Sequence, residues 1–403
     1  MRNAWIILLL LLATPSDAGN RVFDESIRSL TSIVNGDWMN RPVMQLGSDD
    51  RLRVDFDEMS HNFRSMTYHI SHCEADWSIS EEIFESDYLV GFNDLPIEEY
   101  QNSINTVVEY THYSLELPNE RCALKLSGNY RLTISDADNG EKLAEVEFYV
   151  VDRLVDVSLT VSANTDIDHN ASHQQVDMSI NLRQLRLTDD NEELQTVVMQ
   201  NWTEESMRRN VRPTFHTASG LQWTHKKEYI FNAGNEYHKF EVLDVSHPTM
   251  GIENIEWDGQ DFQVYPFPSV ERRNYLTDVD ADGAFLIRNS DRTESDYTCE
   301  YVKVNYELQA PYCGDVYIDG LWATSANRDM YKMVYDDNAR KYTACILQKQ
   351  GYYSYRFTDA QGRNAITEGS FYQTENKYQA LVYYRPNGGR TWLLVGYQYV
   401  EFR

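Results

Sequence analysis

Hydrophobic and polar residues alternate along most of this chain, which is the pattern of strands with one buried face. Leu52, Val54 and Phe56 alternate with charged residues. The same alternation recurs at 66–70, 130–134 and 146–150, and the last of these follows the hairpin signal Asn139-Gly140. No stretch shows the longer repeat of a long amphipathic helix. The pattern therefore predicts an all-β protein with few helices.

The strands fall into three blocks, which predict three tandem β-sandwich domains of the immunoglobulin-like kind. The first block covers 19–152. The second covers 153–270 and ends in an aromatic connector that Pro266 and Pro268 stiffen. The third covers 271–403, where turns such as Asp319-Gly320 separate the expected strands.

The first 18 residues have the pattern of a secretory signal peptide. Arg2 supplies the charge, residues 4–13 are apolar, and Ser16-Asp17-Ala18 offers small residues for cleavage. A spanning helix needs about 20 apolar residues, so this run is too short to cross a bilayer. A buried N-terminal helix or a short anchor is the alternative. We expect an exported, soluble protein.

The net charge of −27 excludes one class of partner. Such a surface repels the phosphates of nucleic acids and the headgroups of anionic lipids, so neither nucleic acid binding nor membrane insertion is expected. The five cysteines leave at least one thiol unpaired, since their number is odd. Cys73 and Cys122 are candidates for a disulfide, and buried thiols are the alternative.

Two residue clusters resemble metal ligands. Asp278, Asp280, Asp282 and Gly283 match the first half of a calcium loop, but Asn289 stands where the loop requires a bidentate Glu. A charged turn between strands is the alternative, and the sequence does not decide whether calcium binds. The sequence HISHC at 69–73 places its two histidines on opposite faces of a strand. We therefore expect no metal and no cofactor.

No catalytic motif is present. The chain lacks a nucleophile elbow, a phosphate-binding loop, a dinucleotide fingerprint and the HExxH zinc motif. Its many acidic residues include no pair that the pattern singles out for sugar hydrolysis. Asp76 and Trp77 could form a sugar platform, although a structural aromatic residue is the simpler interpretation. We expect that the protein is not an enzyme.

Residues 87–119 form the most distinctive segment, rich in Tyr, Asn and Thr. A long ordered loop of this composition on a β scaffold is typical of a binding surface, or of a cover over a sheet edge. Tyrosine is enriched at protein interfaces. The candidate partner-binding residues are Tyr88, Gly91, Phe92, Asn93, Tyr100, Asn105, Tyr110 and Tyr113.

Several motifs, in order along the chain, resemble a known family. DW at 76–77, DYLVGFNDLPIEEYQNSINT at 87–106, YTHYSLELPN at 110–119 and LSGNYRLTI at 126–134 are similar to the N-terminal domain of type IX secretion system plug proteins. VYIDGLW at 316–322, LQKQGYYSYRF at 347–357 and GSFYQTENKYQALVYYRP at 369–386 are similar to that family's C-terminal region. The middle of the chain shows weaker likeness.

The resemblance implies a periplasmic, non-enzymatic protein built of β domains, associated with the inner side of the outer membrane. It implies a stopper that binds the periplasmic mouth of the outer-membrane translocon barrel when no cargo occupies it. The resemblance does not say which residues contact the barrel. The alternative from the residues alone is a secreted carbohydrate-binding protein of several β-sandwich domains.

Overall fold

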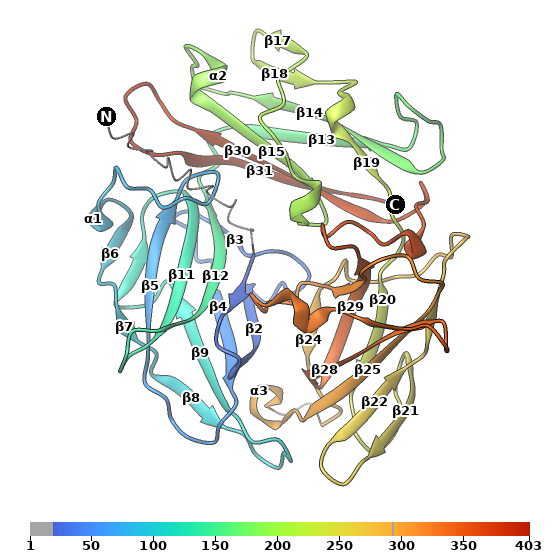
Figure 1. The fold of residues 1–403 in the computed structure, drawn as a ribbon. Helices are drawn as coiled ribbons and strands as arrows, with labels where there is room; N and C mark the ends of the chain where they lie inside the picture. The colour runs from blue at the N-terminus through green and yellow to red at the C-terminus, as the bar shows by residue number, and fades with distance from the viewer. Residues whose placement is uncertain (1–18, 292–293) are drawn as a thin grey trace, which may run out of the picture.

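The computed structural model describes residues 19–291 and 294–403, in which strands form three packed sandwiches (Figure 1). The predicted signal peptide, 1–18, lies outside the described residues. The prediction of an all-β fold of tandem sandwiches is confirmed. Helices in the described part are single turns: α1 (Glu85–Tyr88), α2 (Asp190–Glu193), α3 (Ser295–Thr298), η1 (Glu204–Ser206), η2 (Lys227–Tyr229), η3 (Arg328–Tyr331) and η4 (Ile366–Glu368).

Two sheets face each other in the first sandwich, and a short ribbon lies beside them. The larger sheet consists of β1 (Arg21–Val22), β12 (Lys142–Val151), β11 (Gly128–Asp136), β5 (Met66–Cys73) and β7 (Leu95–Pro96), with β3 (Val43–Gln45) beside β12. The smaller sheet consists of β2 (Ile27–Val34), β4 (Leu52–Glu58), β9 (Thr111–Leu117) and β8 (Glu99–Asn102). The ribbon pairs β6 (Leu89–Gly91) with β10 (Cys122–Leu124).

Alternation along β4 determines which side chains enter this core. Leu52, Val54 and Phe56 are fully buried, and each lies opposite a buried apolar residue of β9. Burial of an apolar side chain of this size contributes about 1.5–3 kcal/mol. The intervening Asp55 and Asp57 point to the other face of the sheet.

The middle sandwich is completed by the last two strands of the chain. One sheet consists of β13 (Asp156–Ser162), β14 (His173–Asn181), β18 (Gly220–Trp223) and β17 (Phe215–Thr217), with β19 (Ile230–Asn232) beside β14. The other consists of β16 (Arg208–Arg209), β15 (Leu194–Gln200), β30 (Asn376–Tyr384) and β31 (Leu393–Phe402).

In the sequence, the strands of the third sandwich lie between the two groups of strands that form the middle sandwich. One sheet consists of β20 (His238–Val242), β29 (Gly351–Thr358) and β24 (Phe285–Ile287), with β26 (Tyr317–Asp319) beside β29. The other consists of β21 (Ile252–Trp257), β22 (Phe262–Pro266), β25 (Tyr301–Gln309), β28 (Lys341–Lys349) and β27 (Val334–Asp336), with β23 (Ser269–Val270) beside β25.

The sheets cross the domain limits predicted from the sequence. The first sandwich is built from strands between Arg21 and Val151. Strands β20 to β23, assigned to the middle block, belong to the third sandwich, and β30 and β31, assigned to the third block, belong to the middle one. The limit at residue 270 therefore divides both sandwiches. Alternation identifies a strand but not its partner, so the pairing of Leu194 with Tyr384 leaves no local signal.

A buried polar cluster joins the first sandwich to the third. Lys349 Nζ lies 2.6 Å from the carboxylate of Asp57, and the Tyr301 hydroxyl donates a hydrogen bond to the same carboxylate at 2.7 Å. His112 Nδ1 lies 2.8 Å from its other oxygen. All four side chains are buried. Because an unpaired buried charge is costly, these contacts favour one orientation of the two domains.

An apolar cluster joins the first sandwich to the middle one. Trp77 and Tyr149 come from the first, and Trp202, Tyr383 and Trp392 come from the middle. The rings of Tyr149 and Trp202 are 5.5 Å apart. Such an interface resembles a domain core more than a mobile hinge, so the three sandwiches form one body.

The structure also bears on the expected absence of a membrane-spanning helix and on the candidate disulfide. No helix in the described part of the chain is long and apolar enough to span a membrane. All five cysteines are free thiols, so the candidate bridge between Cys73 and Cys122 does not form here. Cys73 and Cys122 are both buried, as the alternative proposed.

Candidate functional site

The predicted partner-binding residues separate into buried and accessible groups. Tyr88, Tyr110 and Tyr113 are buried. Phe92 is 74% exposed and Tyr100 is 47% exposed. Gly91 and Asn105 are also exposed, and Asn93 is half-buried. The segment therefore presents part of the predicted surface, while three of its tyrosines stabilise the fold.

Each buried tyrosine has a defined structural role. Tyr113 stacks on Phe56 in the first core, with ring centroids 5.4 Å apart. Tyr88 donates a hydrogen bond to the carbonyl of Ile70 at 3.2 Å. Tyr110 donates to the carbonyl of Cys299 at 2.7 Å and so belongs to the contact with the third sandwich. In this conformation the three are not available to a partner, which corrects their interpretation as contact residues.

An exposed surface that is both apolar and acidic surrounds α1 and β6. This α1–β6 surface comprises Ile79, Phe84, Val90 and Phe92, which are 56–74% exposed, and the acidic residues among them. Residues 76–99 contain eight Asp or Glu and no Lys, Arg or His. In Figure 1, α1 and β6 lie at the outer edge of the first sandwich. Four large apolar side chains exposed within residues 79–92 are more than scattered surface residues require, and such exposure is typical of an interaction site.

Two cations from elsewhere in the chain contact this surface. Arg390 lies 2.9 Å from the carboxylate of Asp87, and Arg121 lies 3.0 Å from that of Glu98. They neutralise two of the eight acidic side chains. The surface therefore keeps an excess of negative charge.

Gly91 and Asn93 hold the α1–β6 surface in place. Gly91 has a φ of 110°, and a Cβ at this position would lie 1.9 Å from the Arg121 carbonyl oxygen, so only glycine allows β6 to approach β10. The Asn93 amide accepts a hydrogen bond from the Ile70 backbone nitrogen at 2.7 Å and donates one to its carbonyl at 2.9 Å. The segment after β6 is thus fixed to the backbone of β5.

A second exposed surface lies at β8 and is called the β8 surface below. Tyr100 packs against Phe63, with ring centroids 4.7 Å apart. Ile104 and Val107 are exposed nearby in the sequence. Phe63 was not predicted because it lies outside the 87–119 segment and has no motif of its own.

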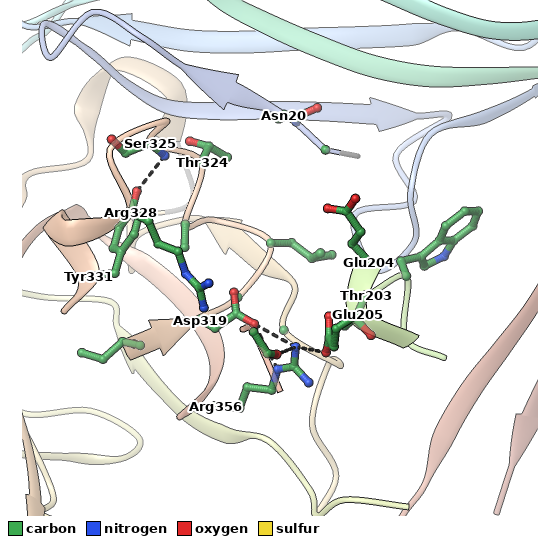
Figure 2. A pocket seen from close by; sticks show the side chains of 18 of the residues that line it. Asn20, Thr203, Glu204, Glu205, Asp319, Thr324, Ser325, Arg328, Tyr331 and Arg356 are labelled. Carbon is green, nitrogen blue, oxygen red and sulfur yellow. Dashed lines mark hydrogen bonds and ion pairs between the residues drawn. The ribbon is translucent and has the colours of Figure 1, made fainter. Parts of the chain in front are cut away.

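A polar cavity of about 470 Å³ lies where the three sandwiches meet (Figure 2). Asn20 comes from the first sandwich, Glu205 from the middle one, and Arg328 and Arg356 from the third. The Arg356 guanidinium lies 2.7 Å from Glu205 and 2.9 Å from Asp319. The charge of Arg356 is therefore already paired. This side chain links the middle and third sandwiches and is not a free cation for a ligand. Sequence reasoning missed the cavity because distant segments line it.

The three aspartates of the candidate calcium loop have separate partners. Asp278 lies 2.6 Å from Lys239, and Asp282 lies 3.3 Å from Lys377. Asp280 is half-buried and accepts a hydrogen bond from the Tyr237 backbone nitrogen. Desolvation and repulsion by Asp282 raise its pKa to about 8. No group of three or more His, Cys, Asp or Glu residues is placed to hold a metal ion in 19–291 or 294–403.

Trp77 does not form a sugar platform. It is 2% exposed, and its ring packs edge-on against Tyr149 with centroids 5.2 Å apart. Its place is in the apolar cluster between the first and middle sandwiches. The simpler structural interpretation of this residue is confirmed.

These features define an all-β protein of three fused sandwiches with an exposed apolar and acidic surface. Residues 27–152 match the family described as the type 9 secretion system plug protein 1st domain. The chain belongs to the type IX secretion system plug protein family. None of the curated proteins matches it.

Solved structures extend the comparison to the whole chain. A hypothetical protein from Parabacteroides merdae is 32% identical, and the alignment covers 96% of this chain and 100% of that one with a TM-score of 0.91. The C-terminal domain of the Streptococcus agalactiae AgI/II polypeptide BspA is 8% identical over 96% and 97% of the two chains. That of the Streptococcus pyogenes antigen I/II-family protein AspA is 9% identical over 93% and 99%. Their TM-scores are 0.16 and 0.18.

Proposed function

We propose that this protein is a periplasmic plug subunit of the type IX secretion system. In this proposal it binds the periplasmic opening of the outer-membrane translocon barrel and closes it when cargo is absent. The family assignment supports a role in type IX secretion. The secretory pattern at 1–18 supports export to the periplasm.

The observation that carries the proposal is the fusion of three sandwiches into one body. A protein that closes a wide opening must resist bending, because a hinge within the plug would leave a gap. The buried pair of Asp57 and Lys349 joins the first and third sandwiches, and the cluster around Trp202 joins the first and middle ones. These contacts supply the required stiffness.

The α1–β6 surface supplies a contact of suitable chemistry. Residues 19–152 contain 26 Asp and Glu against ten Lys and Arg, so the first sandwich carries most of the net negative charge. We expect the complementary face of the barrel to be basic, with an apolar recess for Phe84 and Phe92. Release on arrival of cargo requires a moderate interface rather than one that resembles a core.

Co-purification with the tagged barrel tests this contact. Phe92→Asp should reduce recovery of the protein at least tenfold, because the new carboxylate would be desolvated in the apolar recess. Tyr100→Asp tests the β8 surface in the same way. The matched controls are Phe267→Asp and Tyr399→Asp, which alter side chains of similar exposure in the other sandwiches.

Unchanged recovery of folded Phe92→Asp and Tyr100→Asp would remove this segment from the contact. Loss of the plug itself should admit large antibiotics into cells only while the barrel is present. Retention on a polysaccharide resin, with no retention on the barrel, would favour the carbohydrate-binding alternative instead.

A further inference from the structure

The backbone nitrogen of Gly19 lies against a buried carboxylate. It donates a hydrogen bond to Oε2 of Glu147 at 2.6 Å. Glu147 is on the outer face of β12 and is only 4% exposed. Its other oxygen, Oε1, accepts a hydrogen bond from Nη2 of Arg131 at 2.9 Å. One oxygen therefore contacts a cation, and the other contacts a backbone amide.

Aromatic rings and a second cation, Arg41, surround this contact. Gly19 and Glu147 line a small cavity of about 10 Å³ together with Trp77, Tyr149 and Trp202. Gly19 also lines the polar cavity at the junction of the three sandwiches. Burial raises the pKa of Glu147, despite the contacts with Arg131 and Gly19. A further positive charge at this position would stabilise the carboxylate.

The predicted cleavage site would create that charge. The small residues Ser16 and Ala18 place cleavage directly before Gly19. Hydrolysis of the bond between Ala18 and Gly19 by a peptidase consumes one water and leaves a carboxylate on Ala18 and an amino group on Gly19. An α-amino group has a pKa of about 8, so it is mostly protonated at neutral pH. A neutral donor thus becomes an ammonium group.

We propose that the amino group of Gly19, created by removal of residues 1–18, is a specific cation for Glu147. The ammonium would fix the start of the mature chain between the first and middle sandwiches. Cleavage would then be a maturation step that strengthens this junction as well as a consequence of export. The inference depends on the export that the proposed function requires.

Other charged groups around Glu147 determine how strongly it would attract the Gly19 ammonium. Glu145, on the same face of β12, lies 2.6 Å from Lys142 and 3.8 Å from Arg131. The Arg41 guanidinium would lie 3.2 Å from a Cβ on Gly19 and opposes the added charge. Arg41 also attracts Glu147 and lowers the pKa of its carboxyl. The new ammonium would act in addition, through its direct contact with Oε2 at 2.6 Å.

Acetylation of Gly19 tests the proposal without removing the hydrogen bond. A protease that leaves Gly19 as the first residue provides the mature chain, and its acetylated form keeps the N–H donor but loses the charge. The acetylated chain should unfold at lower urea concentration, with a folding equilibrium constant reduced about tenfold. Glu147→Gln should remove the difference, and Glu145→Gln should keep it.

Chemical labelling gives an independent measurement. In the folded mature chain, the Gly19 amino group should react with an acylating reagent several-fold more slowly than in urea or in Glu147→Gln. The proposal is overturned if acetylation leaves stability unchanged and the amine labels at the rate of the unfolded chain. An exported protein that begins at another residue would also overturn it. None of these measurements involves the barrel, so they remain interpretable if the plug proposal fails.

Discussion

At the scale of single residues, Asp57 connects two domains through one network of charged and polar side chains. It lies on β4 of the first sandwich and contacts Lys349 and Tyr301 of the third. His112 of the neighbouring strand completes the set. Loss of one member of a buried charged cluster leaves the others unpaired, which is more costly than loss of an exposed ion pair.

The charge of His112 should make stability depend on pH. Burial disfavours the imidazolium, but the Asp55 and Asp57 carboxylates, 3.5 and 2.8 Å from its ring nitrogens, outweigh burial and raise the pKa of His112 to about 9 from an ordinary value of 6.5. The stabilisation is complete below pH 6.5 and is lost as pH rises through about 9. At 1.36 kcal/mol per pKa unit, the loss is at most ~3 kcal/mol.

Urea unfolding at pH 6 and at pH 9.5 measures this effect. The wild type should lose more stability over this interval than His112→Gln. His225→Gln is the matched control, because His225 forms a similar contact with Asp166 at 2.9 Å but is exposed. Equal pH dependence in the wild type and His112→Gln would contradict the assignment.

At the scale of elements, the β6–β10 ribbon shows how one residue positions a surface. Gly91→Ala should destabilise the ribbon because a Cβ would overlap the Arg121 carbonyl, only 1.9 Å away. Gly140→Ala is the matched control, since Gly140 has a φ of 73° and no atom within 4 Å of its Cβ position. We expect about 1 kcal/mol for Gly140→Ala and at least ~2 kcal/mol more for Gly91→Ala.

Thermal unfolding and hydrogen exchange of β6 and β10 distinguish these two variants. Gly91→Ala should lower the melting temperature further and should expose the amides of the ribbon. Equal effects of the two substitutions would show that conformation alone, and not close packing, requires glycine at position 91.

The elements also show which features could be predicted from sequence. Alternation predicted the buried face of β4 because Leu52, Val54 and Phe56 follow a simple period. The same pattern assigns Asp57 to the opposite face but does not reveal that another domain covers that face. Exposure of Phe92 and Tyr100 was predicted, whereas burial of Tyr110 depends on the third sandwich. Contacts between domains were beyond the reach of local periodicity.

At the scale of the whole molecule, the last two strands belong to a sandwich that begins long before them. Tyr378, Ala380 and Val382 of β30 are fully buried in the middle core. A chain that ends before Asn376 should therefore lose hydrogen-exchange protection across 155–233. Addition of a peptide of residues 376–403 should restore it. Removal of Arg403 alone is the control, because it is exposed and lies beyond the end of β31.

Full protection of 155–233 in the shortened chain would show that β30 and β31 are dispensable there. Protection that stays absent when the peptide is added would show instead that covalent continuity is needed. The two measurements distinguish the contribution of the packing of β30 and β31 from that of their covalent link to the rest of the chain.

The position of β30 and β31 has a consequence for biogenesis. The whole third sandwich lies between Gln200 and Asn376, so a chain that emerges from its N-terminus cannot complete its middle sandwich until β30 and β31 have followed. The body of three sandwiches is therefore complete only after β31 has emerged. A truncated polypeptide would lack half of the middle sandwich and the contacts of Tyr383 and Trp392 with the first one, so assembly of the rigid body itself depends on completion of the chain.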